Sequence, residues 1–221
     1  MTAIKVGVAG AQNSGKTTFI MDISKSLNNL GYTTEVVNET ARACPLPINE
    51  KCFLSTQLWV ALSQITMEIE TGFNRNDNGN AVLLTDRTIL DNYAYALSFE
   101  IRKRKHFAGT QIMKNILPYW MKTYDMVIYL KPLPTPIEDD GVRSTDQVWQ
   151  RQIDRIIKST IQHYRFNNLI HTIHTINREE RVEEAMLHLT SLLKDNKSKK
   201  TCYNTSKLVQ EQIPVQEVIL A

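Results

Sequence analysis

Short apolar runs alternate along this chain with longer segments in which apolar residues recur every three or four positions. The apolar runs predict buried strands at residues 4–9, 33–37, 81–85, 125–130 and 169–176. The longer segments predict amphipathic helices at residues 16–30, 53–69, 88–105, 111–123, 145–164 and 179–193. This alternation predicts an α/β fold with a five-stranded parallel sheet and helices on both faces. Ligands of such sheets bind at the carboxyl ends of the strands.

The pattern changes near residue 195, and we therefore predict two parts. Residues 1–194 form the domain, and residues 195–221 form a polar linker and a C-terminal tail. Residues 195–206 are polar and carry lysines, which is typical of a flexible linker. Apolar residues return at 213–220, so this end either packs on the domain or on a partner chain, or is a disordered tail.

Composition and charge narrow the possible functions. The net charge of +3 is too small to favour duplex nucleic acid as a partner, but it suits a pocket that receives anionic phosphates. No apolar run has the length that spans a membrane, and the strand pattern that begins at Ile4 argues against a signal peptide. The three cysteines show no metal-binding spacing. We expect reduced thiols in a cytoplasmic protein.

The segment after the first strand carries a phosphate-binding motif. It reads GAQNSGKT, from Gly10 to Thr17, and matches the Walker A pattern G-x-x-x-x-G-K-[ST]. Glycines let backbone N–H groups turn towards phosphates, while Lys16 reaches the β and γ phosphates and Thr17 offers a hydroxyl to Mg²⁺. The predicted residues that bind ATP are Gly10, Gln12, Asn13, Ser14, Gly15, Lys16, Thr17 and Thr18. The alternative is a glycine-rich turn with an exposed lysine, but the strand before the motif and the helix after it favour the three-layer sandwich of P-loop NTPases.

The third strand ends in Asp86-Arg87. A carboxylate at this strand end can hold Mg²⁺ or take part in substrate binding, so Asp86 is a candidate metal ligand and catalytic residue. Many ATPases carry a glutamate next, which activates water. Arg87 in its place favours transfer to a bound acceptor, which the guanidinium could bind. The structural alternative for Asp86 is a helix N-cap, and the two roles are compatible.

The second strand runs into the sequence NETAR at residues 38–42. Glu39 would face the γ phosphate across the crevice and accept a proton from an acceptor hydroxyl or orient it. Arg42 could bind an anionic part of the acceptor. The alternative is a solvated loop in which Glu39 begins a helix.

A loop after the fourth strand has the features of a lid. It reads EDDGVRS at residues 138–144, and Arg143 within it could stabilise charge on the transferring phosphoryl group. The alternative is a solvated loop that leads into a salt-bridged surface helix.

The motifs GAQNSGKT, NETAR, TDR and DDGVRS together resemble the ribosylnicotinamide kinase domain of bacterial NAD-biosynthesis proteins. They also resemble a wider group of small P-loop kinases and ATPases that consist of one AAA-like domain. The resemblance covers roughly residues 3–194. It implies ATP as phosphoryl donor, with Lys16 and Thr17 serving ATP and Mg²⁺. It implies a nucleoside-like acceptor, with Glu39 or Asp86 serving its hydroxyl and Arg143 in the lid.

Nucleoside kinases of the deoxynucleoside type also have a glutamate after strand two and an acid–arginine pair after strand three, as here at Glu39 and Asp86-Arg87. We therefore expect transfer to a nucleoside-like hydroxyl or a nucleoside monophosphate. The alternatives are an ATPase that acts as a switch or effector subunit, and a kinase that acts on nucleic acid. Trp59, Tyr93 and Tyr95 lie on helices that could line an acceptor base pocket. A homodimer is left open, since many small kinases of this fold pair through such helices.

Overall fold

The structure, a computed structural model, describes residues 4–48, 54–73, 80–104, 106, 108–138 and 144–210, without the side chains of 54, 73 and 197–210. Its strands are β1 (Ile4–Ala9), β2 (Thr33–Val37), β3 (Ala81–Asp86), β4 (Met126–Leu130) and β5 (Ile170–Ile173). Its helices are α1 (Lys16–Asn29), α2 (Leu54–Phe73), α3 (Ile89–Lys103), α4 (Ala108–Met121), α5 (Gln147–His163) and α6 (Arg178–Gln210), with 3₁₀ helices at Thr40–Ala43 and Phe166–Asn168. The predicted elements are therefore confirmed in order and type.

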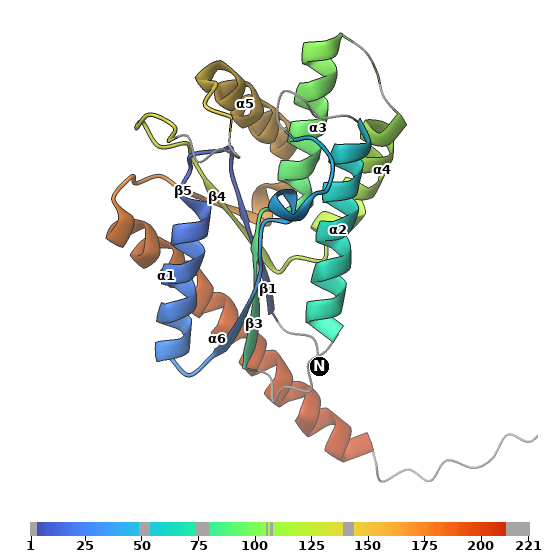
Figure 1. Cartoon of the computed structure of the whole chain (residues 1–221). Coiled ribbons are helices and arrows are strands. Elements are labelled where there is room, and N and C mark those ends of the chain that lie inside the picture. The colour runs from blue at the N-terminus through green and yellow to red at the C-terminus, as the bar shows by residue number, and fades with distance from the viewer. Residues whose placement is uncertain are drawn as a thin grey trace, which may run out of the picture. The chain divides into compact units, whose positions relative to one another are not determined.

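The five strands form one parallel sheet, as predicted, and their order is β2-β3-β1-β4-β5 (Figure 1). β1 lies in the centre, with β3 on one side and β4 on the other. The chain leaves β1 towards one half of the sheet and later returns to the other half. This switch of direction opens a crevice at the carboxyl end of β1, where the Walker A segment begins.

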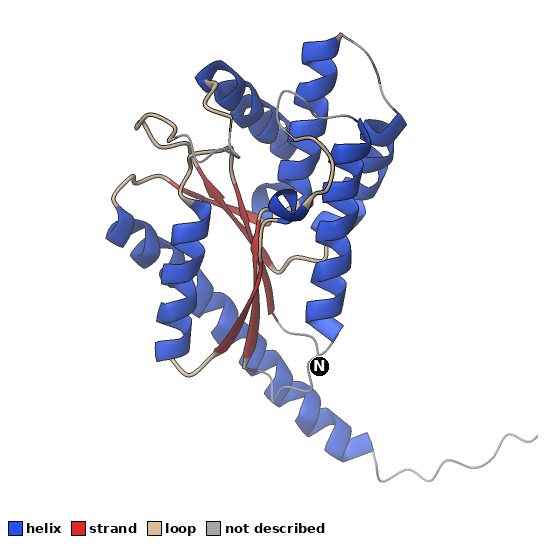
Figure 2. Ribbon diagram, in the orientation of Figure 1, coloured by secondary structure: helices blue, strands red, loops and turns tan. Residues whose placement is uncertain are grey.

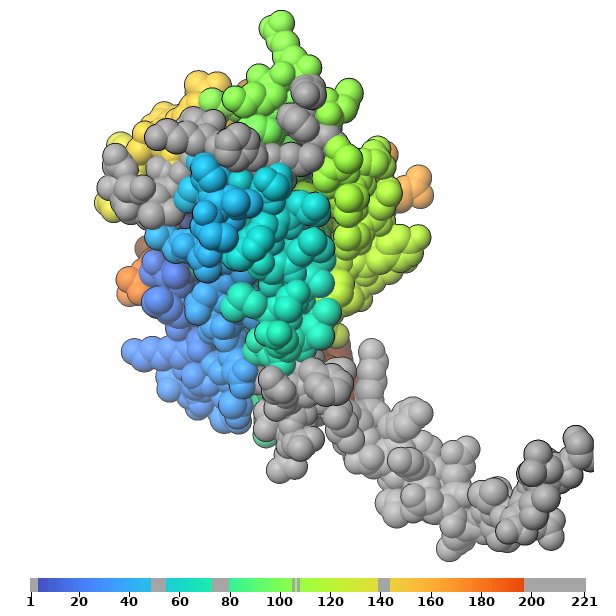
Figure 3. Space-filling model, turned by 45° about the vertical axis from the view of Figure 1, so that its right-hand side comes forward, coloured from blue at the N-terminus to red at the C-terminus, as the bar shows by residue number. Residues whose placement is uncertain are grey.

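Helices cover both faces of the sheet (Figure 2). α1 packs on one face against β1, β2 and β3. α2 and α3 pack together on the other face with α4, and α5 packs on α3. α2 and α4 lie side by side and form a continuous outer surface (Figure 3). The sheet is buried on both sides, so the strands read as apolar runs: every residue of β3 and of β4 is buried.

The second part of the chain differs from the prediction. α6 continues through residues 195–206, where a flexible linker was expected, and ends at Gln210. Low hydrophobicity indicated the linker, but the stretch contains neither proline nor glycine, so nothing in it interrupts helical hydrogen bonding. The division at residue 194 stays a prediction, and residues 211–221 lie outside the described residues.

As predicted, the helix over residues 111–123 runs through Pro118, and helical geometry continues to Met121. The 3₁₀ helix at Thr40–Ala43 was not predicted, and it holds the residues after β2 close to α2, where the Thr40 hydroxyl donates to the Val60 carbonyl at 3.1 Å. Within the described residues, no helix is both long enough and apolar enough to cross a membrane.

Leu84 in β3 is fully buried, whereas Leu30 at the end of α1 is 57% exposed. We expect Leu84→Ala to lower the free energy of unfolding by about 2–5 kcal/mol, because it removes buried methyl groups and leaves a cavity. Leu30→Ala, the matched control, should change it by less than about 1 kcal/mol. Urea denaturation followed by circular dichroism measures both. Equal losses would contradict this assignment of the core.

Candidate active site

The phosphate-binding loop links β1 to α1 in the geometry that its motif requires. Gly15 precedes the helix with φ of 76°, and Asn13 also has a positive φ, 55°. A side chain at Gly10 would meet the Leu130 carbonyl oxygen at 2.5 Å, so only glycine fits there. Residues 12–18 all line one cavity, and their binding of ATP stays a prediction.

The segment after β4 supports the loop from one side. The Leu133 amide donates to the Asn13 carbonyl at 2.8 Å, and the Asn13 side-chain amide donates to the Thr135 carbonyl at 2.8 Å. Because the backbone carbonyl and the side-chain amide of Asn13 are both hydrogen-bonded, these contacts hold its left-handed backbone conformation. The side chain of Asn13 thus supports the loop, and the prediction that Asn13 binds ATP stays a prediction.

Arg181, near the start of α6, supports the loop from another side. Its guanidinium donates to the Ser14 carbonyl through Nη1 at 2.8 Å and to the Thr175 carbonyl through Nε at 2.9 Å. Arg181 is 5% exposed, and burial lowers its pKa. Nothing in the sequence marked Arg181 as a site residue, because charged residues are common in the first turn of a helix.

Lys16 is buried within the loop that it serves. Its ammonium donates to the carbonyls of Gly10 at 2.7 Å and Ala11 at 2.9 Å, and to the Ser14 hydroxyl at 3.2 Å. Burial, and to a smaller extent the positive charge of Arg87, lower the pKa of Lys16 to about 8. An anion brought to this ammonium would restore its pKa, so phosphate binding and protonation of Lys16 are linked.

Asp91, in the first turn of α3, is a site residue that the sequence reasoning missed. It is fully buried, and its Oδ1 accepts the Gly10 backbone N–H at 2.8 Å. Its Oδ2 accepts the backbone N–H and the hydroxyl of Thr88, at 2.9 and 2.8 Å, in a capping box. The spacing Thr88-x-x-Asp91 was the available signal. Thr88, not Asp86, is therefore the N-cap of α3.

Asp86 lies beside the loop, as predicted. Its Oδ2 accepts the Thr17 hydroxyl at 2.6 Å. A hydroxyl and a carboxylate side by side are oxygen ligands of the kind that Mg²⁺ prefers, so this pair fits the ion. Among the described residues, no group of three or more His, Cys, Asp or Glu could hold a metal without further ligands. Magnesium here would need phosphate and water oxygens to complete its coordination.

Glu39 and Arg87 form a partly buried ion pair, with side chains 13% and 10% exposed, which brings the second strand end to the third. The Arg87 guanidinium donates to Glu39 Oε1 at 2.7 Å from Nε, and its Nη2 lies 2.5 Å from the same oxygen. Arg42 approaches Glu39 Oε2 at 3.5 Å. Burial alone would raise the pKa of Glu39, but the charges of Arg87 and Lys16 outweigh it and hold that pKa at about 2. The solvated-loop alternative for Glu39 is therefore wrong.

Arg87 has a strained backbone and a buried side chain. Its φ is 86°, which is unfavourable for a residue with a side chain. Its carbonyl accepts the Thr85 hydroxyl at 2.8 Å and its amide donates to the Val8 carbonyl at 3.1 Å, so the conformation is held from both sides. The strain aims the guanidinium at the Glu39 carboxylate rather than along the strand.

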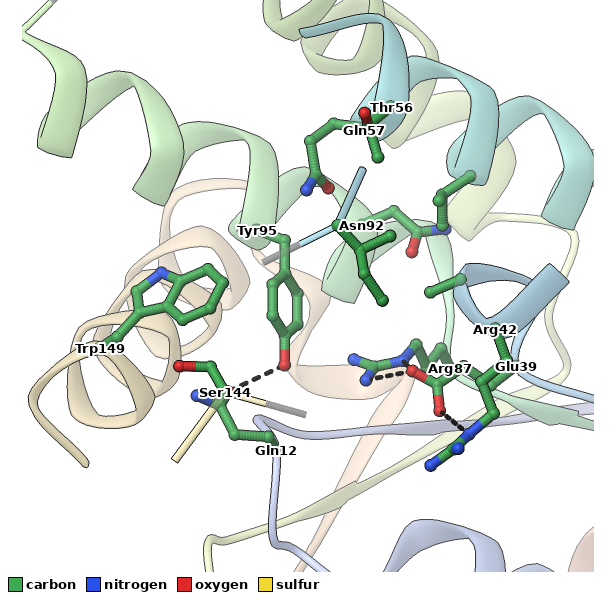
Figure 4. A pocket seen from close by; sticks show the side chains of 13 residues that line it. Gln12, Glu39, Arg42, Thr56, Gln57, Arg87, Asn92, Tyr95, Ser144 and Trp149 are labelled. Carbon is green, nitrogen blue, oxygen red and sulfur yellow. Dashed lines mark hydrogen bonds and ion pairs between the residues drawn. The ribbon is translucent and has the colours of Figure 1, made fainter. Parts of the chain in front are cut away.

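A second cavity adjoins the loop on the side of α2 and α3 (Figure 4). Tyr95 and Trp149 line it, with their rings 5.7 Å apart and edge to face. Asn92 also lines it, with a buried Nδ2 that has no hydrogen-bond partner. Of the aromatics expected to line an acceptor pocket, Tyr95 does so.

Three residues belong to both cavities: Gln12, Glu39 and Arg87. The phosphate cavity and the second cavity therefore meet at the Glu39–Arg87 pair. The predicted residue Arg42 lines the second cavity, and Asp86 lines the phosphate cavity. Arg143 and the rest of the predicted lid at 139–143 lie outside the described residues.

The fold and this loop define a P-loop nucleotide-binding protein of the α/β class. A family model described as an AAA domain matches residues 5–181, and the chain belongs to that family. No curated protein matches the chain in sequence.

Solved structures share the fold at low sequence identity. A deoxyadenosine kinase from M. mycoides with products dCMP and a flexible dCDP bound matches with a TM-score of 0.62 and 14% identity, over 85% of this chain and 100% of that chain. The same kinase with bound dCTP matches with a TM-score of 0.59 and 17% identity, over 85% of this chain and 100% of that chain. At this identity the likeness shows the fold alone.

The pKa of Lys16 predicts how binding of MgATP depends on pH. Above pH 8 the ammonium of the free protein is largely neutral, and bound phosphates must return its proton, so binding takes up a proton. We expect the affinity to fall by up to about tenfold per pH unit above pH 8. Isothermal titration calorimetry in buffers of different ionisation enthalpy measures the proton uptake.

Two variants test whether Lys16 takes up this proton. Lys16→Met should bind MgATP more weakly and without proton uptake. Lys25→Met, on the exposed face of the same helix, should keep it. A wild-type affinity that stays constant from pH 7 to pH 9.5 would contradict the assigned pKa.

Asp91→Asn tests the connection between α3 and the loop. An amide replaces one carboxylate oxygen with a donor, which must then face the N–H of Gly10 or of Thr88. We expect a loss of about 1–3 kcal/mol in the free energy of unfolding and weaker binding of MgATP. The matched control is Asp22→Asn, which removes only a surface ion pair with Arg178. Unchanged stability in Asp91→Asn would show that its carboxylate is dispensable.

Proposed function

We propose that this protein transfers the γ-phosphoryl group of ATP to a nucleoside-like hydroxyl or to a nucleoside monophosphate. One observation carries the proposal: a cavity lined by the phosphate-binding loop meets a second, partly aromatic cavity at the Glu39–Arg87 pair. A nucleotide hydrolase needs one substrate pocket and a water. Two pockets that join at a charged pair suit two substrates that exchange a group.

The proposed transfer forms one P–O bond and breaks another. An acceptor oxygen forms a bond to the γ phosphorus while the bond to the β–γ bridging oxygen breaks, and ADP leaves with that electron pair. The proton of an acceptor hydroxyl passes to a carboxylate or to water. Glu39 is the better placed carboxylate, because it lines both cavities while Asp86 is bound to Thr17.

The low pKa of Glu39 defines its role further. A carboxylate held at a pKa of about 2 by arginines is a weak base, so it orients the acceptor hydroxyl and receives the proton late in the transfer. Arg87 then holds the Glu39 carboxylate and stabilises negative charge where the two cavities meet. When bound, Mg²⁺ would be held by Thr17 and Asp86 and would neutralise charge on the phosphates. Arg143 is proposed to close over the site from the lid.

The neighbouring structures support an acceptor of the nucleoside class. The M. mycoides kinase that shares the fold is named for its action on deoxyadenosine, and its structures contain dATP or dCTP. The likeness of the sequence motifs to ribosylnicotinamide kinases supports the same class. Both support an acceptor with a pentose sugar, with the base held near Tyr95 and Trp149 in the second cavity.

The test is ADP release from MgATP with and without a panel of nucleosides, deoxynucleosides, nicotinamide riboside and nucleoside monophosphates. We expect release to rise at least tenfold with one class of acceptor. Glu39→Gln should then lower kcat by about 10²–10⁴-fold, because it removes the carboxylate that orients the hydroxyl, and should leave the affinity for MgATP within a few-fold. Glu68→Gln is a poor control, since Glu68 is buried in its own network, so the exposed Glu179→Gln serves instead.

Three outcomes would count against the proposal or against part of it. ADP release that no acceptor changes would favour an ATPase that acts as a switch or effector. Full activity in Glu39→Gln with loss in Asp86→Asn would move the acceptor role to Asp86. Turnover that required a nucleic-acid end would favour a kinase that acts on nucleic acid.

Location in the cytoplasm and a homodimer also stay predictions.

A further inference from the structure

Gln12 is the third residue of the phosphate-binding loop, and it lies where the phosphate cavity meets the second cavity. It is 5% exposed and lines both cavities. Its backbone carbonyl accepts the Gln150 side-chain amide at 2.8 Å, and its Oε1 accepts the Tyr95 hydroxyl at 2.8 Å (Figure 4). Its Nε2 is buried and has no hydrogen-bond partner.

The direction of the Gln12 amide follows from its neighbours. The Arg87 guanidinium lies over the Tyr95 ring, 4.9 Å from the centroid, and can only donate hydrogen bonds. The guanidinium also forms a hydrogen bond with the Tyr95 side chain, in which the hydroxyl oxygen can only accept, so the Tyr95 O–H is left to donate to Gln12. Oε1 of Gln12 accepts that O–H, which leaves Nε2 as the end of the amide that needs an acceptor.

A buried donor without a partner costs about 1–3 kcal/mol, so this amide is favoured by a ligand that supplies an acceptor atom. The phosphoryl group is such a ligand, because its oxygens only accept hydrogen bonds. It would also lie between the two cavities during transfer, where Gln12 lies. Asn92 has a similar unpaired donor, but it lines only the second cavity and is left for the acceptor molecule.

We propose that Gln12 Nε2 donates a hydrogen bond to an oxygen of the transferring phosphoryl group, and that Tyr95 sets the direction of this donor. The inference rests on the proposed function and names a further residue of that site. Gln12 neither gains nor loses a proton, so its effect is on the charge of the phosphoryl oxygens. Tyr95 lines the second cavity, so a bound acceptor molecule and the donor loop are connected through one hydrogen bond.

The test uses the full chain and a mimic of the phosphoryl group in transfer, and it needs no known acceptor. Calorimetry compares the affinity for MgADP with the affinity for MgADP plus aluminium fluoride. We expect the wild type to bind the fluoride complex at least tenfold more tightly. Gln12→Met and Gln12→Leu, which remove the donor without adding a charge, should lose most of that difference and bind MgADP within about threefold of the wild type.

Two further variants show whether the loss reflects this hydrogen bond. Tyr95→Phe keeps Nε2 but frees its direction, and it should lose part of the preference for the fluoride complex. Gln162→Glu, on the exposed part of α5, is the matched control and should keep all of it. A preference that persists in both Gln12 variants would overturn the inference, as would equal loss of MgADP binding, which indicates a role in loop shape only.

The proposed function can fail separately. If ADP release does not respond to any acceptor but the fluoride complex still depends on Gln12, the residue serves phosphoryl transfer to water, and only the kinase assignment fails. If acceptor-dependent turnover is observed and both Gln12 variants keep the wild-type kcat, the kinase assignment stands and the role of Gln12 is wrong.

Discussion

The buried carboxylate of Asp91 holds the site together. It accepts one N–H from the first residue of the phosphate-binding loop and two donors from the cap of α3, although Gly10 and Asp91 are 81 residues apart. A carboxylate in the protein interior is costly unless its oxygens are hydrogen-bonded, and here both oxygens are. Because the loop and the helix share this one group, neither can move far without leaving a buried charge or a buried N–H unpaired.

That constraint explains how four buried charged groups coexist in a small volume. The positive charge of Arg87 lowers the pKa of Lys16, and the negative charges of Asp91 and Glu39 act in the opposite direction. Each carboxylate has a separate hydrogen-bond set, so the charges are not interchangeable. Asp91 accepts from backbone and Thr88, while Glu39 accepts from Arg87. The cost of burying these groups lowers the pKa of Lys16, and a bound triphosphate would relieve that cost.

The sequence predicted the sheet, its helices and the phosphate-binding loop, because each depends on residues that are close together in the chain. Periodicity identified the strands, and one motif identified the loop. It also placed Glu39 and Asp86 at strand ends, since parallel strands end on the same edge. It could not show that Arg87 pairs with Glu39, because that contact depends on a positive φ at Arg87. Nor could it show Arg181, whose contact with Ser14 spans 167 residues.

The two cavities of the site differ in how many segments of the chain build them. The phosphate cavity is built largely from one local segment, whereas the second cavity draws residues from the end of β2, from α2 and α3, and from the start of α5. Residues such as Asn92 and Trp149 line the second cavity without lining the first. A substitution at these positions would therefore leave the lining of the phosphate cavity unchanged. Gln12, Glu39 and Arg87 line both cavities. In the proposed transfer, a change at any of these three would alter the handling of the phosphoryl group together with the choice of acceptor. We therefore expect acceptor specificity to depend mainly on the residues farther from the loop.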